Sequence, residues 1–175
     1  MTAAFARELR VPITYQNVLV EQTWSRAGNL YLGSNHVNLV LTETPSEFLN
    51  TYQTTRQTLT IDFLRPKEME RFHTHPLEER DIVAMYLNNR AAEALADGRT
   101  DDAYWWAREA VTQNPAFISG YNTLAVIYQR GGHSALAETV LRAALEREPE
   151  NTVIMHNMLP VLAALGKTGE ANQVR

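Results

Sequence analysis

Apolar residues follow a helical period through the second half of the chain. Between positions 118 and 131 they recur at spacings of three and four, on one stripe of a helix: Tyr121, Leu124, Ala125 and Tyr128. A similar stripe follows after a short break: Ala137, Leu141, Ala144 and Leu145. Gly132 stands between the stripes, where a left-handed residue is needed to end the first helix. The pattern predicts two helices that pack together, with alanines where they cross closely.

The same pattern returns every 34 residues. The recurring positions hold small residues and a proline: Gly98, Ala103, Ala110 and Pro115, then Gly132, Ala137, Ala144 and Pro149, then Gly166 and Ala171. The prolines are expected to stop the second helix of each pair, since proline lacks an N–H group. The first copy is looser, because Arg90 stands where the second copy has Leu124. Pro160 is expected to interrupt the first helix of the third copy.

A 34-residue period with small residues and a proline at these offsets resembles the tetratricopeptide repeat, which consists of two antiparallel helices. The resemblance covers residues 82–175 and implies an all-α solenoid of two and a partial repeats, at 84–117, 118–151 and 152–175. Such repeats carry no chemistry of their own. The resemblance therefore implies a scaffold that binds a protein or peptide.

The N-terminal part has strand character. A short helix is predicted at residues 3–9, residues 43–57 are predicted as a loop with a helical turn, and strands are predicted at Ile13–Val20, Leu30–Leu32, Val37–Leu41 and Leu59–Phe63. The two middle strands are either separate or continuous across Gly33. The predicted fold class is α+β, with a small antiparallel β segment at 1–65, a charged connection at 66–81 and the helical solenoid at 82–175.

Two ionisable residues fall on polar strand faces in this prediction. A period of two places His36 beside Asn38 and away from Val37, and it places Asp62 away from Ile61. If the two strands pair as antiparallel neighbours, the imidazole and the carboxylate can meet. An Asp beside a general-base His is two thirds of a nucleophilic triad. The alternative is a pair of ordinary polar-face residues.

The order of four segments resembles the later half of a bacterial transglutaminase-like domain, a papain-related fold that is sometimes joined to tetratricopeptide repeats. The segments are residues 10–18 (RVPITYQNV), 24–26 (WSR), 35–39 (NHVNL) and 61–63 (IDF). His36 and Asp62 match the family's catalytic His and Asp. The family's nucleophilic Cys has no counterpart, because this chain contains no cysteine. The resemblance therefore implies a remnant or an excerpt of such a domain, without activity as given.

Composition excludes several classes of function. The chain has 175 residues, 45% of them hydrophobic, which suits one or two domains with a core. A net charge of −4 argues against a general nucleic-acid partner. No apolar run approaches a membrane span, and no signal peptide is visible, so the cytoplasm is the default expectation while the compartment stays open. The lack of cysteine excludes disulfides and thiolate zinc sites.

A weak metal candidate lies in the predicted connection. His73 and His75 stand near Glu78 and Glu79. An i, i+2 pair directs both rings to one side only in a strand, and this stretch is charged and flanked by proline. We favour a solvated connection and expect neither a metal nor a cofactor.

Two classes of function remain: an interaction module, and a fragment of a transglutaminase-like peptidase or acyltransferase whose nucleophilic Cys lies outside this chain. We favour the first. In the repeat family the fifth positions look into a concave groove, and here they are Asn88, Asn122 and His156. Gln129 and Arg130 lie nearby, and Arg130 supplies a cation for an acidic group. A solvated face without a ligand is the alternative.

Overall fold

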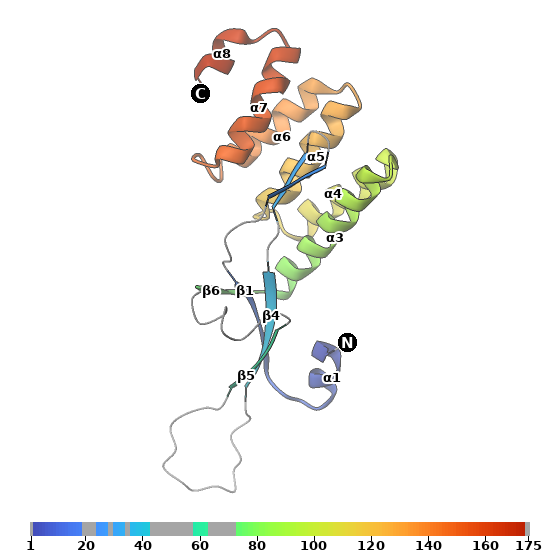
Figure 1. The fold of residues 1–175 in the computed structure, drawn as a ribbon, viewed down its shortest axis with the longest axis vertical. Helices are drawn as coiled ribbons and strands as arrows, with labels where there is room; N and C mark the ends of the chain where they lie inside the picture. The colour runs from blue at the N-terminus through green and yellow to red at the C-terminus, as the bar shows by residue number, and fades with distance from the viewer. Residues whose placement is uncertain are drawn as a thin grey trace, which may run out of the picture. The chain divides into compact units, whose positions relative to one another are not determined.

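The chain divides into two compact units, Met1–Glu79 and Arg80–Arg175. The computed structural model describes residues 2–18, 24–27, 30–33, 36–42, 58–62 and 73–173 (Figure 1). The predicted loop at 43–57 lies outside the described residues, as do Leu19, Val20 and Phe63 at the ends of predicted strands.

The first unit contains a short helix, α1 (Thr2–Glu8), and two antiparallel sheets. The larger sheet has the strand order β5-β4-β1-β6, and the smaller one pairs β2 with β3. The strands are β1 (Ile13–Val18), β2 (Trp24–Ala27), β3 (Leu30–Gly33), β4 (His36–Thr42), β5 (Thr58–Ile61) and β6 (Thr74–Leu77). The predicted short helix and the predicted strands are therefore present, with small differences at their ends.

Four details of the first unit differ from the prediction. Strand β2 was not predicted, and it pairs with β3 in the smaller sheet. Strands β3 and β4 belong to different sheets, so they are not one strand continuous across Gly33. Strand β6 lies inside the segment predicted as a connection, and it tolerates Pro76 because an edge strand does not need every N–H group. Asn38 and Val40 are buried, as is Leu39 between them, so the middle of β4 is covered on both faces.

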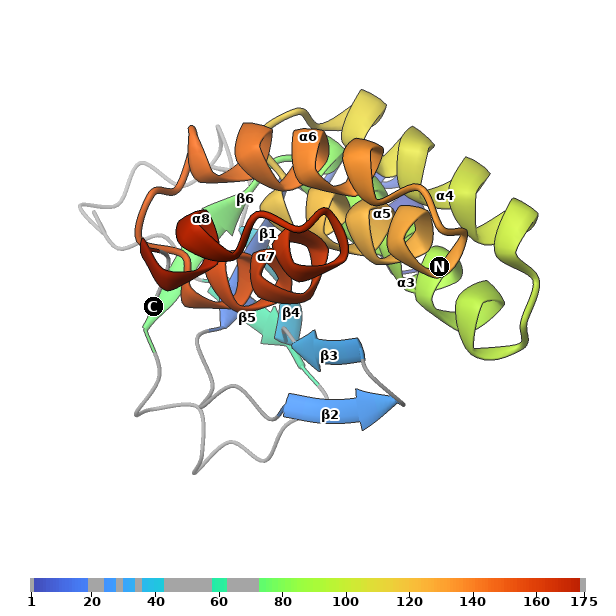
Figure 2. The same cartoon turned by 90° about the horizontal axis from the view of Figure 1, so that it is seen from above.

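The second unit is a series of helical hairpins. Its helices are α3 (Glu79–Ala96), α4 (Thr100–Gln113), α5 (Ile118–Arg130), α6 (Ser134–Leu145), α7 (Thr152–Ala164) and α8 (Thr168–Gln173). The first helices of the hairpins, α3, α5 and α7, lie in one layer, and α4 and α6 lie in another (Figure 2). Within the part of the chain that the structure describes, no helix has the length and apolarity to cross a membrane.

The turns inside the hairpins have the predicted geometry. Gly98, Gly132 and Gly166 have φ angles of 76°, 78° and 71°. Each lies between the two helices of a hairpin, and residues with a Cβ atom rarely adopt this conformation. The glycines that recur every 34 residues in the sequence are therefore the left-handed turn residues, one in each hairpin.

The core of the second unit comes from the predicted stripes. Ala103, Ala110, Ala137, Leu141 and Ala144 are all fully buried. The last three belong to a larger apolar core that also includes Ile154, Met158, Val161 and Leu162. The alanines allow close helix contact because they carry little side-chain volume.

Helix α7 runs through Pro160, so the predicted interruption is wrong. Proline removes one backbone hydrogen bond, but apolar packing on both sides holds the helix together. Met158 and Val161 flank the proline and are almost completely buried. The start of the helix is fixed by Asn151, whose Oδ1 accepts a hydrogen bond from the backbone N–H of Ile154 at 3.1 Å.

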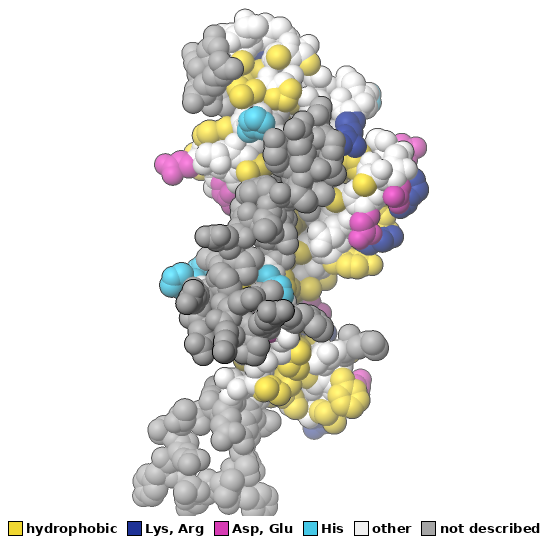
Figure 3. All heavy atoms as spheres, in the orientation of Figure 1, with side chains coloured by type: hydrophobic (Ala, Val, Ile, Leu, Met, Phe, Trp, Pro, Cys, Tyr) yellow, Lys and Arg dark blue, Asp and Glu magenta, His cyan; other side chains and the backbone are white. Residues whose placement is uncertain are grey.

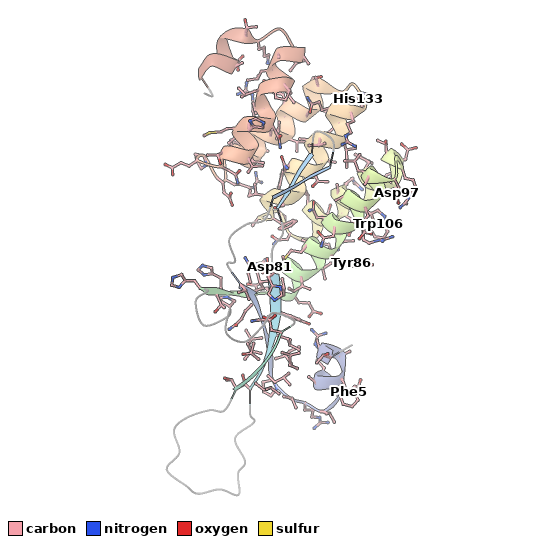
Figure 4. The ribbon with its side chains drawn as sticks, in the orientation of Figure 1. Phe5, Asp81, Tyr86, Asp97, Trp106 and His133 are labelled. Carbon is pink, nitrogen blue, oxygen red and sulfur yellow. The ribbon has the colours of Figure 1, made fainter. Side chains whose placement is uncertain are left out.

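Side-chain hydrogen bonds also close the first hairpin and join the second hairpin to the third. At the start of α3, Asp81 (Figure 4) accepts a hydrogen bond from Nδ2 of Asn114 at 2.6 Å. Near the C-terminal end, Lys167 donates to both carboxylate oxygens of Glu138, at 2.8 Å each, and Nε of Arg142 donates to Oε1 at 2.9 Å. The Lys167 bonds connect α6 to the turn that follows α7, and the Arg142 bond lies within α6.

Glu138 should make the stability of the repeats depend on pH. Hydrogen bonds from Lys167 and then from Arg142 lower the pKa of Glu138 below its ordinary value. A lowered folded-state pKa gives stability that is present above the unfolded-state pKa, about 4.3, and that is lost as pH falls through the folded-state value. We expect Glu138→Gln to destabilise the protein at pH 7, with a difference from the original chain that shrinks below about pH 4.

Urea unfolding at a series of pH values, followed by circular dichroism, measures this difference. Glu150→Gln is the matched control, because Glu150 is exposed on the same unit. The original chain and Glu138→Gln are not expected to diverge in their free energy of unfolding as the solution is acidified. A difference that grows toward low pH would contradict the lowered pKa of Glu138.

Candidate functional site

The first helices of the three hairpins carry the predicted binding residues at equivalent places. Asn88 lies on α3, Asn122 on α5 and His156 on α7, each 34 residues after the one before. We call the surface that these three residues define on α3, α5 and α7 the inner face. Because the three helices share a layer (Figure 2), the repeated position forms a row across it.

Asn122 is held in a fixed orientation by a residue that the sequence analysis missed. Its Oδ1 accepts a hydrogen bond from Nδ2 of Asn157 on α7, at 2.6 Å. Asn122 is only 8% exposed, so this bond is shielded from water. The only signal for Asn157 in the sequence is its place one residue after His156.

The other predicted residues of the inner face have different surroundings. The Oδ1 atom of Asn88 is buried, and among the described residues it has no hydrogen-bond partner. Arg130 is exposed, and its Nη1 makes a long contact of 3.4 Å with the backbone carbonyl of Leu95. Gln129 is half-buried beside it. The structure therefore places all five predicted binding residues on α3, α5 and α7.

The two later helices of the inner face carry little charge. Helices α5 and α7 carry one Lys, Arg, Asp or Glu side chain between them, which is Arg130. Charged side chains gather instead at the turn between α3 and α4 (Figure 3). There Arg99 donates hydrogen bonds to Asp102 at 2.7 Å and to Asp97 at 3.1 Å, so opposite charges are paired. Asn122 on α5 and His156 on α7 are consequently among the main polar features of the first helices of the second and third hairpins.

The first unit contains a second polar site. Strands β4 and β5 pair as antiparallel neighbours, with Leu39 opposite Ile61. This register brings His36 and Asp62 together, and the distance from Nε2 to Oδ1 is 2.5 Å. The Asp62 side chain is 4% exposed and that of His36 is 22% exposed. A nearly buried carboxylate therefore orients an imidazole that solvent can reach.

The weak metal candidate is not a cluster in the structure. His75 lies in β6 opposite Asn17 of β1, and both His73 and His75 are exposed. Within the described residues there is no group of three or more His, Asp or Glu side chains with metal-binding geometry. His75 belongs to a strand, which the prediction of a solvated connection did not include.

Comparison with known proteins concerns the helical unit. No family model matches the chain. The chain is similar to the human tetratricopeptide repeat protein 7A, with 32% identity over 87 residues, which are 50% of this chain and 10% of that protein. Among solved structures it is similar to the first tetratricopeptide repeat domain of Spaghetti (RPAP3) bound to the HSP90 peptide SRMEEVD. The TM-score is 0.52 and the identity 20%, over 54% of this chain and 76% of that one.

The helical unit has a tetratricopeptide-repeat fold. A Pseudomonas aeruginosa PilF structure is similar at a TM-score of 0.53 and 25% identity, over 55% of this chain and 44% of that one. The TPR2B domain of yeast Sti1, in its complex with pHsp70, is similar at a TM-score of 0.51 and 15% identity, over 53% of this chain and 74% of that one. These matches cover about half of the chain, the share that the repeats occupy, so they support the tetratricopeptide assignment that the 34-residue period predicts.

Proposed function

We propose that the repeat unit binds a peptide or a segment of a partner protein on its inner face. The observation that carries the proposal is the row of Asn88, Asn122 and His156 across the first helices of the hairpins. Two similar structures support it, because the RPAP3 domain is bound to an HSP90 peptide and the Sti1 domain is in a complex with pHsp70. Asparagine suits such a surface, since its amide both donates and accepts hydrogen bonds.

The double substitution Asn88→Ala with Asn122→Ala tests this function. The probe is the most enriched heptapeptide from a random display library that is selected on the full chain. Each lost hydrogen bond costs about 0.5 to 1.5 kcal/mol, so we expect the dissociation constant to rise between about fivefold and a hundredfold. Calorimetric titration measures the change.

The matched control is Thr112→Ala with Thr139→Ala, since both threonines are exposed on second helices of the hairpins. The proposal is contradicted if the selected heptapeptide binds with unchanged affinity to the double asparagine variant and also to Arg130→Ala. The binding site then lies elsewhere on the chain. A fall in affinity with Arg130→Ala alone indicates that the peptide carries an acidic group there.

A second candidate function concerns the first unit. We propose that it is the later part of a transglutaminase-like acyl-transfer domain whose nucleophilic Cys lies outside this chain. The observation that favours this candidate is the 2.5 Å contact between Nε2 of His36 and Oδ1 of Asp62. The contact leaves Nδ1 of His36 as the ring nitrogen that can take a proton from a nucleophile, as a general base does.

We expect this chain by itself to release no ammonia from a glutamine-containing peptide. Loss of a triad nucleophile costs on the order of 10⁴ to 10⁶ in rate. The longest reading frame that includes the chain and an upstream Cys is expected to be active, and to lose its activity with His36→Ala. Turnover by the present chain that disappears with His36→Ala contradicts this role, since it requires a nucleophile other than Cys.

A further inference from the structure

The two edges of the four-stranded sheet differ in their protection against the addition of another strand. The strand order is β5-β4-β1-β6, so β5 and β6 are the edges. Proline and charged residues at an edge hinder the pairing of a further strand. Strand β6 contains Pro76 and is followed directly by Glu78 and Glu79. Strand β5, with the sequence TLTI, has no proline and no charged residue.

Strand β5, which lies beside β4 (Figure 1), is open to solvent. Thr58, Leu59 and Thr60 are all exposed, and Leu59 is 62% exposed although it is a large hydrophobic residue. The ladder with β4 uses the backbone N–H and C=O groups on one side of β5 only. Those on the other side meet no further strand in the described part of the chain. The edge therefore offers backbone donors and acceptors, which are the groups that another strand pairs with.

The side chains of β5 divide between an apolar and a polar face of the sheet. Leu59 lies opposite Leu41 of β4, and Ile61 lies opposite Leu39. Residues that are opposite each other, and residues two apart on one strand, point to the same face, so these four side chains share one face. The two threonines of β5 point to the other face. The apolar face of the sheet consequently reaches its exposed edge and ends there at Leu59.

We propose that β5 pairs with β5 of a second copy of this chain, antiparallel and about a two-fold axis at Thr60. The two four-stranded sheets then form one continuous sheet across the axis. Thr60 lies opposite Thr60 of the second copy, and Leu59 lies opposite Ile61 of the second copy. The inference depends neither on peptide binding by the repeats nor on the acyl-transfer candidate.

A second copy is the complementary partner, because the strand matches itself in this register. Leu59 and Ile61 meet on one face, so the apolar faces of the two sheets are joined. The threonines at the axis meet on the other face, where hydroxyl groups can hydrogen-bond to each other. No like charges are brought together, since β5 carries none. A shift by one residue sets Leu59 against Thr60, and an axis at Leu59 leaves Ile61 without an apolar partner.

The expected dimer dissociates on dilution. A pair of short strands buries less than the roughly 1,200 Å² of a specific, stable interface, so we expect a dissociation constant above about 1 µM. Sedimentation velocity of the full chain from about 5 to about 500 µM covers this range. The sedimentation coefficient is expected to rise with concentration from the monomer value toward the dimer value. A chain that stays monomeric throughout overturns the proposal, even if the strand of another protein can add to β5.

Thr60→Lys and Thr60→Glu test the position of the axis. Each variant alone places two like charges directly opposite each other, so we expect each to stay monomeric where the original chain dimerises. An equal mixture of the two variants is expected to dimerise again, because opposite charges then face each other. Thr112→Lys is the matched control, since Thr112 is exposed on α4 in the other unit. This control is expected to dimerise as the original chain does.

Hydrogen exchange of the original chain tests the same contact without a substitution. The amide N–H groups of β5 are expected to exchange several-fold more slowly at high than at low protein concentration, because pairing takes them out of water. Exchange of β5 that does not depend on concentration overturns the proposal.

Thermal unfolding by circular dichroism shows whether each variant is folded. If Thr60→Lys does not fold, Leu59→Lys decides, because Leu59 is also exposed and a lysine at an edge hinders strand addition. Leu59→Lys is likewise expected to be monomeric. Dimerisation that persists in the folded lysine variant, or a mixture of Thr60→Lys and Thr60→Glu that stays monomeric, overturns pairing at Thr60.

Discussion

Leu141→Ala is expected to lower the free energy of unfolding of the repeat unit by about 2 to 5 kcal/mol. Leu141 lies on α6, is 0% exposed, and belongs to the core that joins the second and third hairpins. The substitution removes apolar contacts and leaves a cavity that the surrounding helices fill only in part. Because a domain has roughly 5 to 15 kcal/mol of stability in total, we expect a large shift in the urea midpoint.

Leu136→Ala is the control for this prediction. Leu136 lies on the same helix but is 49% exposed, so its truncation removes little buried area. The urea concentration at the unfolding midpoint of Leu136→Ala is expected to differ little from that of the original chain. Equal effects of Leu141→Ala and Leu136→Ala would show that the core described between α6 and α7 does not hold the unit together.

Ala91→Leu should destabilise the repeat unit by about 1 to 3 kcal/mol, for the opposite reason. Ala91 is fully buried on α3, one of several alanines of the first hairpin that have no exposed surface. A leucine there adds volume where the helices already pack closely, so the helices must separate or the side chain must take a strained rotamer.

Ala96→Leu separates this packing effect from a change in helix propensity. Ala96 is exposed at the end of the same helix, and leucine is nearly as good a helix former as alanine. We expect Ala96→Leu to change the free energy of unfolding by less than about 0.5 kcal/mol. An Ala91→Leu variant as stable as the original chain would mean that the first hairpin has room that the buried alanines do not indicate.

The helical half could be predicted from sequence because its signals are local. Gly98, Gly132 and Gly166 mark the turns, and the stripes between them repeat with the period of a helix. The length of the period then determined the fold. Pro160 misled the prediction, because the packing that carries α7 through it depends on residues from other helices.

The first half was harder to predict, because strand pairing joins distant residues. The segment that forms β6 shows no clear alternation and contains Pro76, so nothing local marks it as a strand. The burial of Asn38 on the predicted polar face of β4 was also missed, since a period of two gives faces but not what covers them. The contact between His36 and Asp62 was predicted correctly, because it required only that β4 and β5 be neighbours.

The places of the candidate binding residues on the first helices were predicted, their hydrogen bonds were not, and their binding role stays a prediction. Family resemblance and the 34-residue spacing were enough to place Asn88, Asn122 and His156 in a row. The orientation of the Asn122 amide depends on Asn157 from the next repeat, and no local pattern announces a hydrogen bond between two helices. A hydrogen bond between side chains of two different helices can be identified only from the three-dimensional arrangement of those helices.

Several side-chain hydrogen bonds in the described part of the repeat unit reach about one repeat along the chain. They span 33 residues from Asp81 to Asn114, 35 from Asn122 to Asn157 and 29 from Glu138 to Lys167. Contacts of such short sequence separation close quickly, because little chain entropy is lost in bringing the partners together. During synthesis on the ribosome, each residue of these pairs can therefore meet its partner once about thirty further residues have been added to the chain. The repeats can then form one after another, before the whole chain is complete.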